Sequence, residues 1–231
     1  MTPHYAVIGA GAGGLCAAKY LRAAGVETTI FEAGSRIGGL WVFDNDSGMS
    51  PAYKSLHMNS ESRVSCFVDF PFPIDAPLYP DHLEMSSYFE RYADHFDLRH
   101  RIRFNAPIAS VERVGSQFRV TTAAGDGTMF DGVVVATGHQ SVPRHPPQIA
   151  AFAGDYIHSH AYRTPARYTD KRVLVIGPGN SGVDIAADVC SVTRQTMVSA
   201  RSPVLIMPRL MFGVPNSRTL LKLERPFLPW R

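Results

Sequence analysis

The chain has 231 residues, of which 45% are hydrophobic and 19% charged, and this composition is typical of a globular protein rather than a disordered one. Its length allows one large domain or two small ones. The net charge of +3 is mild and no block of lysine and arginine stands out, so a nucleic-acid-binding role is not indicated. No apolar stretch is long enough to span a bilayer, so we expect no membrane partner.

The cysteines and the N-terminus indicate a reducing compartment. Cys16, Cys66 and Cys190 are odd in number and far apart, with no CxxC pair and no spacing typical of a metal site, so we expect buried thiols and no metal. The apolar run of residues 6–18 could pass for a signal peptide, but no lysine or arginine precedes it. We therefore expect a soluble, cytoplasmic protein.

The first predicted elements are a strand, a glycine-rich turn and a helix. Residues 5–8 are typical of a buried parallel strand, and residues 15–22 favour a helix. Between them stands Gly9-x-Gly11-x-x-Gly14. In a dinucleotide site these glycines make the tight turn, let the backbone approach a pyrophosphate and let the helix pack closely on the strand. The helix N-terminus then offers free N–H groups to the phosphates.

The second predicted strand comprises residues 26–31, and Glu32 follows it at once. This acid lies 18 residues after Gly14, where a dinucleotide-binding fold places its ribose-binding carboxylate; a solvated strand-end carboxylate is the alternative. The next run, residues 36–41, suits a loop close to a bound phosphate or ring, or a plain Gly-Gly turn. The cofactor-binding candidates up to this point are Gly9, Gly11, Gly14, Glu32, Arg36, Gly39, Leu40 and Trp41.

The middle of the chain predicts loops, one helix and a small antiparallel insertion. Residues 44–66 are rich in turn formers and predict a loop with a short helix, and residues 67–73 are interrupted by prolines. Asp81 can cap a helix that runs to about His95. Strand candidates follow at 102–104, 108–113, 117–121 and 128–130, with a hairpin turn at 124–127.

Residues 133–136 predict a fully buried strand that ends at Thr137 and Gly138, and such a strand end can lie against an adenine nucleotide in an open α/β sheet. A second fingerprint, Gly177-x-Gly179-x-x-Gly182, follows a buried strand at 171–176. A helix at 183–189 and a strand at 196–199 come next. The cofactor-binding candidates here are Thr137, Gly138, Gly177, Gly179, Asn180, Ser181, Gly182, Ser199 and Arg201.

The two fingerprints differ where the ribose would bind. In place of Glu32 the second unit has Ser199, Ala200 and Arg201. A carboxylate would repel a 2′-phosphate, whereas a guanidinium can bind one in bidentate fashion, although a solvated loop arginine is the alternative. We therefore predict FAD at the first site and NADPH at the second, because a hydride must pass from one carrier to another.

Between the fingerprints lies Phe152-x-Gly154-x-x-x-His158-x-x-x-Tyr162. With the two fingerprints, Glu32 and residues 37–41, this motif resembles the flavin-containing monooxygenases (class B flavoprotein monooxygenases). The likeness extends to residues 55–59 and 67–73 and covers essentially the whole chain. Related Baeyer–Villiger enzymes usually carry Trp in place of Tyr162, which favours the branch that oxidises heteroatoms.

The resemblance implies a cycle in which NADPH reduces FAD, oxygen adds to the flavin at C4a, and an amine or sulfide takes the distal oxygen of this hydroperoxide. Asn59 matches a catalytic asparagine beside the flavin, although a loop asparagine is the alternative from the residues alone. His158 is interpreted as a hinge or interdomain hydrogen-bonding residue rather than a proton carrier. No role is assigned to His139 or His160.

The predicted fold class is α/β, with two Rossmann-like dinucleotide-binding units, an FAD unit and a partial NADPH unit, and a small antiparallel β insertion. We expect an FAD-binding domain over residues 1–165, lacking its usual C-terminal return, and a partial NADPH-binding domain over 166–231. After residue 199 come residues 203–207, a loop and residues 220–225, but no further strand that would close the sheet. Missing elements would leave apolar faces uncovered.

Family members continue beyond this length, so the resemblance implies an N-terminal portion of a monooxygenase. The alternatives are a truncated, non-catalytic nucleotide-binding remnant and a subunit of a split enzyme that binds a complementary C-terminal half. A homodimer also stays open. A pyridine nucleotide-disulfide reductase shares the paired fingerprints but needs a redox CxxC, which this chain lacks.

Overall fold

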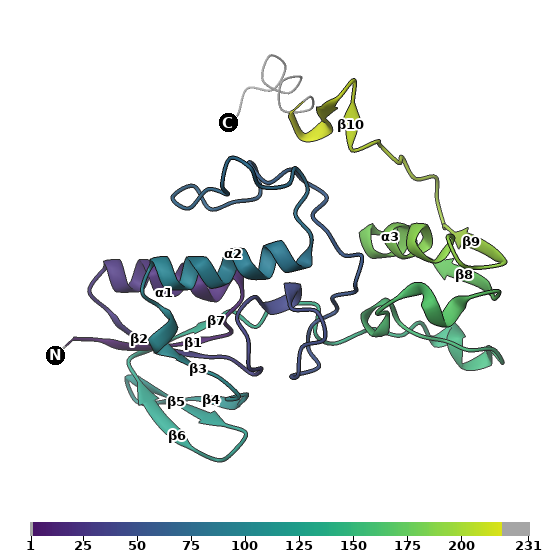
Figure 1. The fold of residues 1–231 in the computed structure, drawn as a ribbon. Coiled ribbons are helices and arrows are strands. Elements are labelled where there is room, and N and C mark those ends of the chain that lie inside the picture. The colour runs from purple at the N-terminus through teal and green to yellow at the C-terminus, as the bar shows by residue number, and fades with distance from the viewer. Residues whose placement is uncertain (1, 219–231) are drawn as a thin grey trace. The chain divides into compact units, whose positions relative to one another are not determined.

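The computed structural model describes residues 2–218, which form two compact units (Figure 1). The first unit comprises Met1–Lys54 and His82–Arg163, and the second comprises Ser55–Asp81 and Thr164–Arg231. Residues 55–81 thus group with the second unit, whereas the sequence places them in an FAD-binding domain. The assignment of nucleotide domains to 1–165 and 166–231 stays a prediction. The expected stretch at 220–225 lies outside the described residues.

The first unit is built on a parallel sheet of four strands in the order β3-β2-β1-β7. These strands are β1 (His4–Ile8), β2 (Glu27–Phe31), β3 (Ile102–Arg103) and β7 (Gly132–Val135). In the register, Ile8 lies opposite Phe31 on one side and Val135 on the other. The carboxyl ends of β1, β2 and β7 are therefore aligned, and this is the edge at which open α/β sheets bind ligands.

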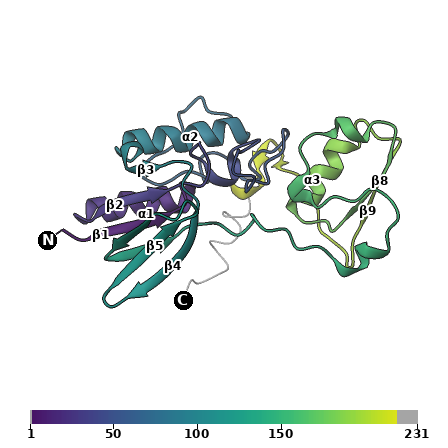
Figure 2. The same cartoon turned by 90° about the horizontal axis from the view of Figure 1, so that it is seen from below.

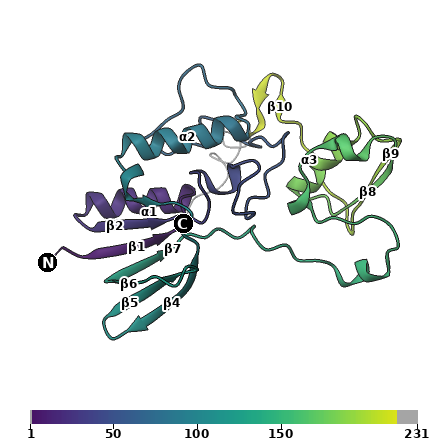
Figure 3. The same ribbon diagram turned by 60° about the horizontal axis from the view of Figure 1, so that its bottom comes forward.

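Helices and antiparallel strands cover opposite faces of this sheet. Figures 1 and 3 show α1 (Ala12–Ala23) and α2 (His82–His95) side by side on one face, and β4 (Ile108–Val114), β5 (Gln117–Thr122) and β6 (Gly127–Phe130) on the other. Ala6 and Phe31 of the parallel sheet pack against Val120 and Phe130 of the antiparallel one. Every element predicted for this unit between residues 102 and 136 is present, with bounds shifted by one or two residues.

The second unit contains the parallel pair β8 (Arg172–Ile176) and β9 (Gln195–Ser199), with α3 (Asn180–Val189) packed beside it (Figure 2). A short antiparallel pair, β10 (Leu210–Met211) and β11 (Val214–Pro215), was not predicted. Single turns of 3₁₀ helix complete the two units: η1 (Gly39–Trp41), η2 (Arg99–Arg101), η3 (Pro147–Ala151), η4 (Ser159–Ala161) and η5 (Pro165–Tyr168).

Residues 55–81, called the Asn59 loop below, contain neither a helix nor a named strand, so the short helix expected within residues 44–66 is wrong. The two ends of the loop pair with each other. His57 forms an isolated bridge with Asp81, and the Met58 N–H donates to the Pro80 carbonyl at 2.8 Å. The Ser62 N–H donates to the Leu78 carbonyl at 2.9 Å. The turn-forming sequence therefore makes a closed loop, because its backbone groups are satisfied across the neck.

Two strands predicted to be fully buried are not. Val135 of β7 is 68% exposed, and in β8 Leu174 and Ile176 are 54% and 64% exposed. The physical reason is the size of each sheet: β7 lies at a sheet edge and β8 pairs only with β9. A β-branched run predicts a buried strand only when further strands or helices cover it. Within residues 2–218 that cover is incomplete.

The prediction of buried thiols is wrong for Cys190. The three cysteines are unpaired in the described part of the chain, and Cys16 and Cys66 are partly buried. Cys190 is exposed because it caps the C-terminal end of α3, where the helix leaves its packed face, and its Sγ donates to the Ala187 carbonyl at 3.0 Å. Separately, none of the helices over residues 2–218 is both long and apolar enough to cross a bilayer.

Candidate functional site

The first turn, Gly9–Gly14, joins β1 to α1 and accepts no side chain at its two ends. Gly9 has a φ of +107°, and a Cβ there would lie 2.5 Å from the Ala136 carbonyl oxygen. A Cβ on Gly14 would overlap the Gly9 carbonyl oxygen. The glycines are therefore required by backbone contacts between the strand end and the helix, as the sequence pattern predicts.

Other predicted residues converge on the first turn. A Cβ on Gly39 would lie 3.1 Å from the Cα of Gly11, so the loop of residues 36–41 touches the turn through its backbone. The Gly38 N–H also donates to the Ala10 carbonyl at 3.2 Å. Thr137 and Gly138 follow the end of β7 after one residue and are exposed at the same edge. The structure thus brings together candidates from three separate stretches of sequence.

Glu32 holds the first turn in place. The side chain is 7% exposed, and its Oε2 accepts a hydrogen bond from the Ala10 N–H at 2.8 Å. Its Oε1 accepts from the Gly34 N–H at 3.0 Å. A carboxylate has about four lone-pair sites, so two remain for other donors. Glu32 is therefore neither solvated nor a simple strand-end residue, and its contact with a ribose stays a prediction.

The loop of residues 36–41 is held by Arg36, whose Nη2 donates to the Phe43 carbonyl at 2.7 Å and to that of Asp44 at 3.3 Å. Leu40 and Trp41 lie on η1, where Leu40 is exposed and Trp41 half-buried. Arg36 thus stabilises the shape of this loop. Contacts of these three side chains with a cofactor stay predictions.

The second turn, Gly177–Gly182, repeats the backbone bonds of the first 168 residues later in the chain. The N–H of its first glycine donates to the end of the neighbouring strand, and a Cβ on its last glycine would overlap the carbonyl oxygen of the first. At the first glycine, the Gly9 N–H donates to the Phe31 carbonyl at 2.8 Å, and the Gly177 N–H donates to that of Ser199 at 2.9 Å. At the start of the helix, the Leu15 N–H donates to the Gly11 carbonyl at 3.0 Å, and the Val183 N–H donates to that of Gly179 at 2.9 Å.

Two positions that are hydrogen-bonded to each other in the first unit are both changed in the second. Ile176 lies opposite Ser199 as Ile8 lies opposite Phe31, so Ala200 stands where the first unit has Glu32. By the same register, Pro178 replaces Ala10. Proline has no N–H to donate and alanine has no carboxylate to accept. The second unit therefore lacks both halves of the hydrogen bond that closes the first turn.

The remaining candidates of the second unit are exposed. Asn180 and Ser181 begin α3, and Arg201 follows the end of β9 by two residues. No hydrogen bond or ion pair of the Arg201 guanidinium is found among the described residues, so this cation is available beside the position without an acid. Its contact with a phosphate stays a prediction.

The motif residues lie in the last part of the first unit. Tyr162 is 1% exposed and packs its ring against Tyr53 with centroids 5.7 Å apart. Phe152 is exposed, and its ring fills the space that a Cβ on Gly154 would need. Three of these residues thus have packing roles, whatever their part in catalysis.

His158 caps η4, because its Nδ1 accepts a hydrogen bond from the His160 N–H at 3.1 Å. Burial lowers the pKa of His158, and the neighbouring His145, with ring centroids 5.5 Å apart, lowers it further. Both effects favour the neutral imidazole, in which Nδ1 can accept this hydrogen bond.

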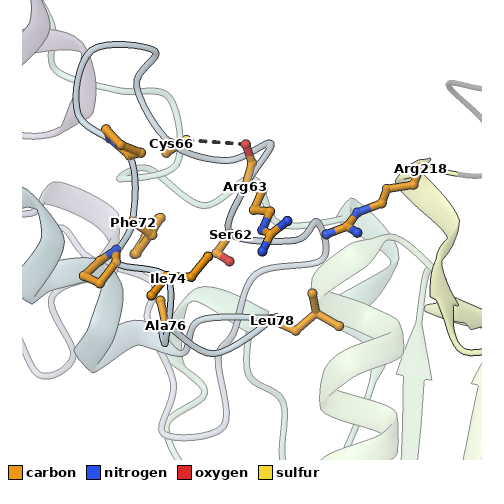
Figure 4. Close-up of a pocket in the computed structure, with 10 residues that line it drawn as sticks. Ser62, Arg63, Cys66, Phe72, Ile74, Ala76, Leu78 and Arg218 are labelled. Carbon is orange, nitrogen blue, oxygen red and sulfur yellow. Dashed lines mark hydrogen bonds between the residues drawn. The ribbon is translucent and has the colours of Figure 1, made fainter.

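Asn59 is exposed and belongs to the same compact unit as the second turn. The Asn59 loop also contributes to a cavity of about 500 Å³ whose wall contains none of the predicted site residues (Figure 4). It is lined by Ser62, Arg63, Cys66, Pro71, Phe72, Pro73, Ile74, Ala76, Leu78 and Arg218. Figure 4 shows Arg218 extending toward the part of the loop that carries Ser62 and Arg63.

Sequence reasoning missed the side chains that hold the Asn59 loop. Glu61 is 1% exposed, and its Oε1 accepts from Arg218 Nε at 2.7 Å. Ser55 Oγ donates to Asp188 Oδ2 at 2.7 Å. The partners are 157 and 133 residues apart, so no local pattern pairs them. The one available signal was the spacing of Asp184 and Asp188, which places two acids on one face of a predicted helix.

Comparison with known proteins identifies the family. The family model described as "Flavin-binding monooxygenase-like" matches residues 3–224. The chain is 38% identical over 224 residues to flavin-containing monooxygenase 1 of Homo sapiens, an alignment that covers 91% of this chain and 42% of that protein.

Two solved structures show similar folds. S-allyl-L-cysteine S-oxygenase from Allium sativum has a TM-score of 0.79 at 33% identity, over 93% of this chain and 54% of that one. A variant of cyclohexanone monooxygenase from Rhodococcus sp. Phi1, bound to NADP⁺, has a TM-score of 0.70 at 26% identity, over 90% and 40%. The chain thus spans about two fifths of the length of the curated relatives it matches. The predicted α/β fold class is confirmed, and the chain belongs to the flavin-binding monooxygenase-like family.

Proposed function

We propose that this chain supplies the nucleotide-binding elements of an NADPH- and oxygen-dependent flavoprotein monooxygenase, with FAD at the first turn and NADPH at the second. The observation that carries the proposal is the duplicated turn with its matched exchange of Glu32 and Ala10 for Ala200 and Pro178. The two turns share one backbone geometry, while the residue placed to contact the ribose changes from Glu32 to Ala200, as expected for two different dinucleotides.

The residues at the first turn fit FAD. The backbone around Gly11 is bare apart from Gly39, whose Cα lies 3.5 Å from the position of a Gly11 Cβ, and a Cβ on Gly138 would meet nothing within 4 Å. The start of α1 carries no acid that would repel a pyrophosphate. Glu32 keeps acceptor capacity for the ribose hydroxyls after its two backbone bonds.

The residues at the second turn fit NADPH. A Cβ on Gly177 or Gly179 would meet nothing within 4 Å, so the space a pyrophosphate would need beside this turn is open. Ala200 presents no negative charge to a 2′-phosphate, and Arg201 supplies a positive one. This charge arrangement favours NADPH over NADH.

A bound flavin, reduced by the nicotinamide, supplies the chemistry that transfers one atom of oxygen from O₂. We propose an amine or a sulfide as the acceptor. The S-oxygenase from Allium sativum, whose name states a sulfur substrate, supports this choice. Tyr162 supports it as well, because related Baeyer–Villiger enzymes usually carry Trp at this position of the motif between the two fingerprints. Asn59 is the candidate that would hydrogen-bond near the reacting centre, because an amide both donates and accepts without changing charge.

Other functions stay open beside this proposal. The likeness to cyclohexanone monooxygenase supports ketone oxygenation of the Baeyer–Villiger type. A subunit that depends on a complementary chain, and a nucleotide-binding remnant without catalysis, also stay open as alternatives. The homodimer and the cytoplasmic location stay predictions, tested by light scattering and by cell fractionation.

The test uses the visible spectrum of the 231-residue chain. FAD is added, unbound flavin is removed, and NADPH or NADH is added without oxygen. Retained flavin that bleaches faster with NADPH than with NADH supports the proposal at both turns. Retained flavin that neither nucleotide bleaches contradicts reduction by this chain alone and favours the split subunit. A chain that retains no flavin contradicts the proposal at the first turn.

A further inference from the structure

The Asn59 loop is tied to α3 at both of its ends. At the start of the loop, Ser55 Oγ donates to Asp188 Oδ2 at 2.7 Å. Near its end, the Tyr79 hydroxyl donates to the Arg209 carbonyl at 2.9 Å, and the Arg209 guanidinium lies 5.6 Å from the Tyr79 ring. Arg209 Nη2 in turn lies 4.0 Å from Asp184 Oδ1. Both ties end on carboxylates of the same helix.

Asp184 and Asp188 are one helical turn apart, so they project from one face of α3. The opposite side of the helix carries its buried residues, Ile185, Ala186 and Val189. The helix therefore packs with one surface and holds the Asn59 loop with another. Because Gly179 of the second turn is the N-cap of α3, the loop and that turn are connected through a single helix.

The loop is also stiff between its ties. Its two ends are joined by the backbone hydrogen bonds of Met58 to Pro80 and of Ser62 to Leu78. Glu61, which lies in the loop, also accepts a hydrogen bond from Arg218, which lies outside it. Asn59 lies between Met58 and Ser62, inside this bonded stretch. A displacement of α3 would therefore carry Asn59 with it rather than deform the loop.

We propose that Ser55 and Asp188 are a positioning pair: their hydrogen bond fixes the Asn59 loop to α3, so that Asn59 follows the dinucleotide held at the second turn. The tie itself rests on contacts within one unit. Its consequence for the reaction rests on the proposed function, because only there does Asn59 have a catalytic part. The pair would make nucleotide binding and the placement of Asn59 a single event.

The experiment is hydrogen–deuterium exchange of the 231-residue chain without ligand, read by mass spectrometry on peptides that cover residues 55–62 and 78–81. The bonded N–H groups of Met58 and Ser62 report the closed loop. Ser55→Ala removes the hydroxyl that binds Asp188. Ser191→Ala is the matched control, because Ser191 Oγ also binds residue 188 at 2.7 Å, but at its backbone carbonyl.

Ser55→Ala and Asp188→Ala should each speed exchange in the two loop peptides about fivefold, the effect of losing one exposed hydrogen bond to a charged group. Asp188→Asn keeps an acceptor and should stay close to the wild type. In the loop peptides the double variant should exchange no faster than Asp188→Ala, because the bond that Ser55→Ala removes is already absent there. Equal exchange in Ser55→Ala and Ser191→Ala would overturn the positioning pair, as would faster exchange confined to α3 in Asp188→Ala.

A second arm separates this inference from the proposed function. NADP⁺ is added, and its binding is measured by calorimetry on the same samples. In the wild type, slower exchange in α3 should be accompanied by slower exchange in the loop, and Ser55→Ala should abolish the second effect only. Protection of wild-type α3 without protection of the loop would overturn the coupling. Absence of binding would contradict NADPH at the second turn, while the ligand-free comparison still decides the positioning pair.

Discussion

The two units contain one turn in two different surroundings. Around the first turn, β1 lies between β2 and β7, helices cover one face and antiparallel strands the other, so Ala6 and Val7 are fully buried. Around the second turn, β8 pairs with β9 alone among residues 2–218, and its Leu174 and Ile176 are exposed. The turn bonds are nevertheless equivalent. The geometry of a glycine-rich turn is therefore set by its own residues and two flanking strands, and does not require a complete core.

The chemical difference that bears on the ribose lies at the position after the second strand and at the turn residue that binds it in the first unit. Glu32 both closes the first turn and offers acceptors to a ligand. In the second unit this function is absent, and Arg201 stands free beside the turn among the described residues. The same backbone turn can therefore be used to bind two different nucleotides, because a carboxylate stands beside the first turn and a guanidinium beside the second. The following changes test that comparison, the largest expected effect first.

Replacement of the last glycine of either turn should have the largest effect. A Cβ on Gly14 or Gly182 would overlap a backbone oxygen, which cannot move without breaking the turn. Gly14→Ala should destabilise the first unit by about 3 kcal/mol, the upper range for overpacking, and abolish FAD binding. Gly182→Ala should abolish NADP⁺ binding and leave FAD binding intact. Urea unfolding followed by Trp41 fluorescence in a Trp230→Phe background measures the stability of the first unit, and nucleotide titrations measure binding at both turns.

Gly13→Ala is the matched control for these variants. Its Cβ would lie 3.9 Å from the Ala136 Cβ, an ordinary contact, in a helix that favours alanine over glycine. It should keep or raise the stability of the first unit. An equal loss of stability of the first unit in Gly13→Ala and Gly14→Ala would show that the contact between residue 14 and Gly9 does not determine the turn.

Glu32→Ala should have the next largest effect. Its loss leaves the buried Ala10 N–H without an acceptor, which we expect to cost about 2 kcal/mol for a charged partner. FAD binding should also weaken, because the proposed contact of Glu32 with the ribose is lost. Glu32→Gln should lose less stability, since one oxygen remains. Unfolding of the two variants without nucleotide isolates the role in the turn, and an unchanged stability in Glu32→Ala would contradict it.

Arg201→Ala tests the charge at the second turn. It should weaken NADP⁺ binding about tenfold and leave NAD⁺ binding unchanged, because only the former has a 2′-phosphate. Arg194→Ala is the control, since Arg194 is an exposed arginine at the other end of the same strand. Calorimetric titration of both nucleotides measures the ratio. An equal loss of NADP⁺ affinity in Arg201→Ala and Arg194→Ala would contradict a specific contact of Arg201 and show only the effect of net charge.

The sequence was most informative where structure is local. The turns, their flanking strands and Glu32 were predicted because each depends on residues close together in the chain, and β2 differs from its predicted range by one residue. The exposure of β8 was missed because it depends on whether other strands pair with it. The pairing of β10 with β11 has no strong local pattern, because each strand has only two residues.

The candidate site shows the same limit. The glycines of the first turn, Gly39 and Thr137 were predicted one by one, and the structure brings them together at one sheet edge. The ties of the Asn59 loop were not predicted, because Ser55 and Asp188 are 133 residues apart and each reads alone as a solvated polar residue. Long-range pairs of this kind become visible only when the fold places them together.

The smallest expected effect concerns pH and belongs to the first unit alone. Burial, with His145 nearby, lowers the pKa of His158 below its unfolded value near 6.5, so the unfolded chain binds the proton more readily. This contribution to stability is present above that pH and is lost as the pH falls through the folded pKa. Protonation would also remove the acceptor that His158 Nδ1 offers to the His160 N–H. The unfolding free energy should therefore decrease from pH 7 to pH 5.

His158→Asn should flatten this pH dependence, because an amide oxygen can accept the same bond without titrating. The sequence contains a second tryptophan, so unfolding is followed in a Trp230→Phe background, where Trp41 fluorescence reports the first unit and exchange in α3 reports the second. The variant should change the pH slope of the former and leave the latter as in the wild type. The same slope in both proteins would assign the pH dependence to other groups, and a change in α3 would show that the two units do not respond separately.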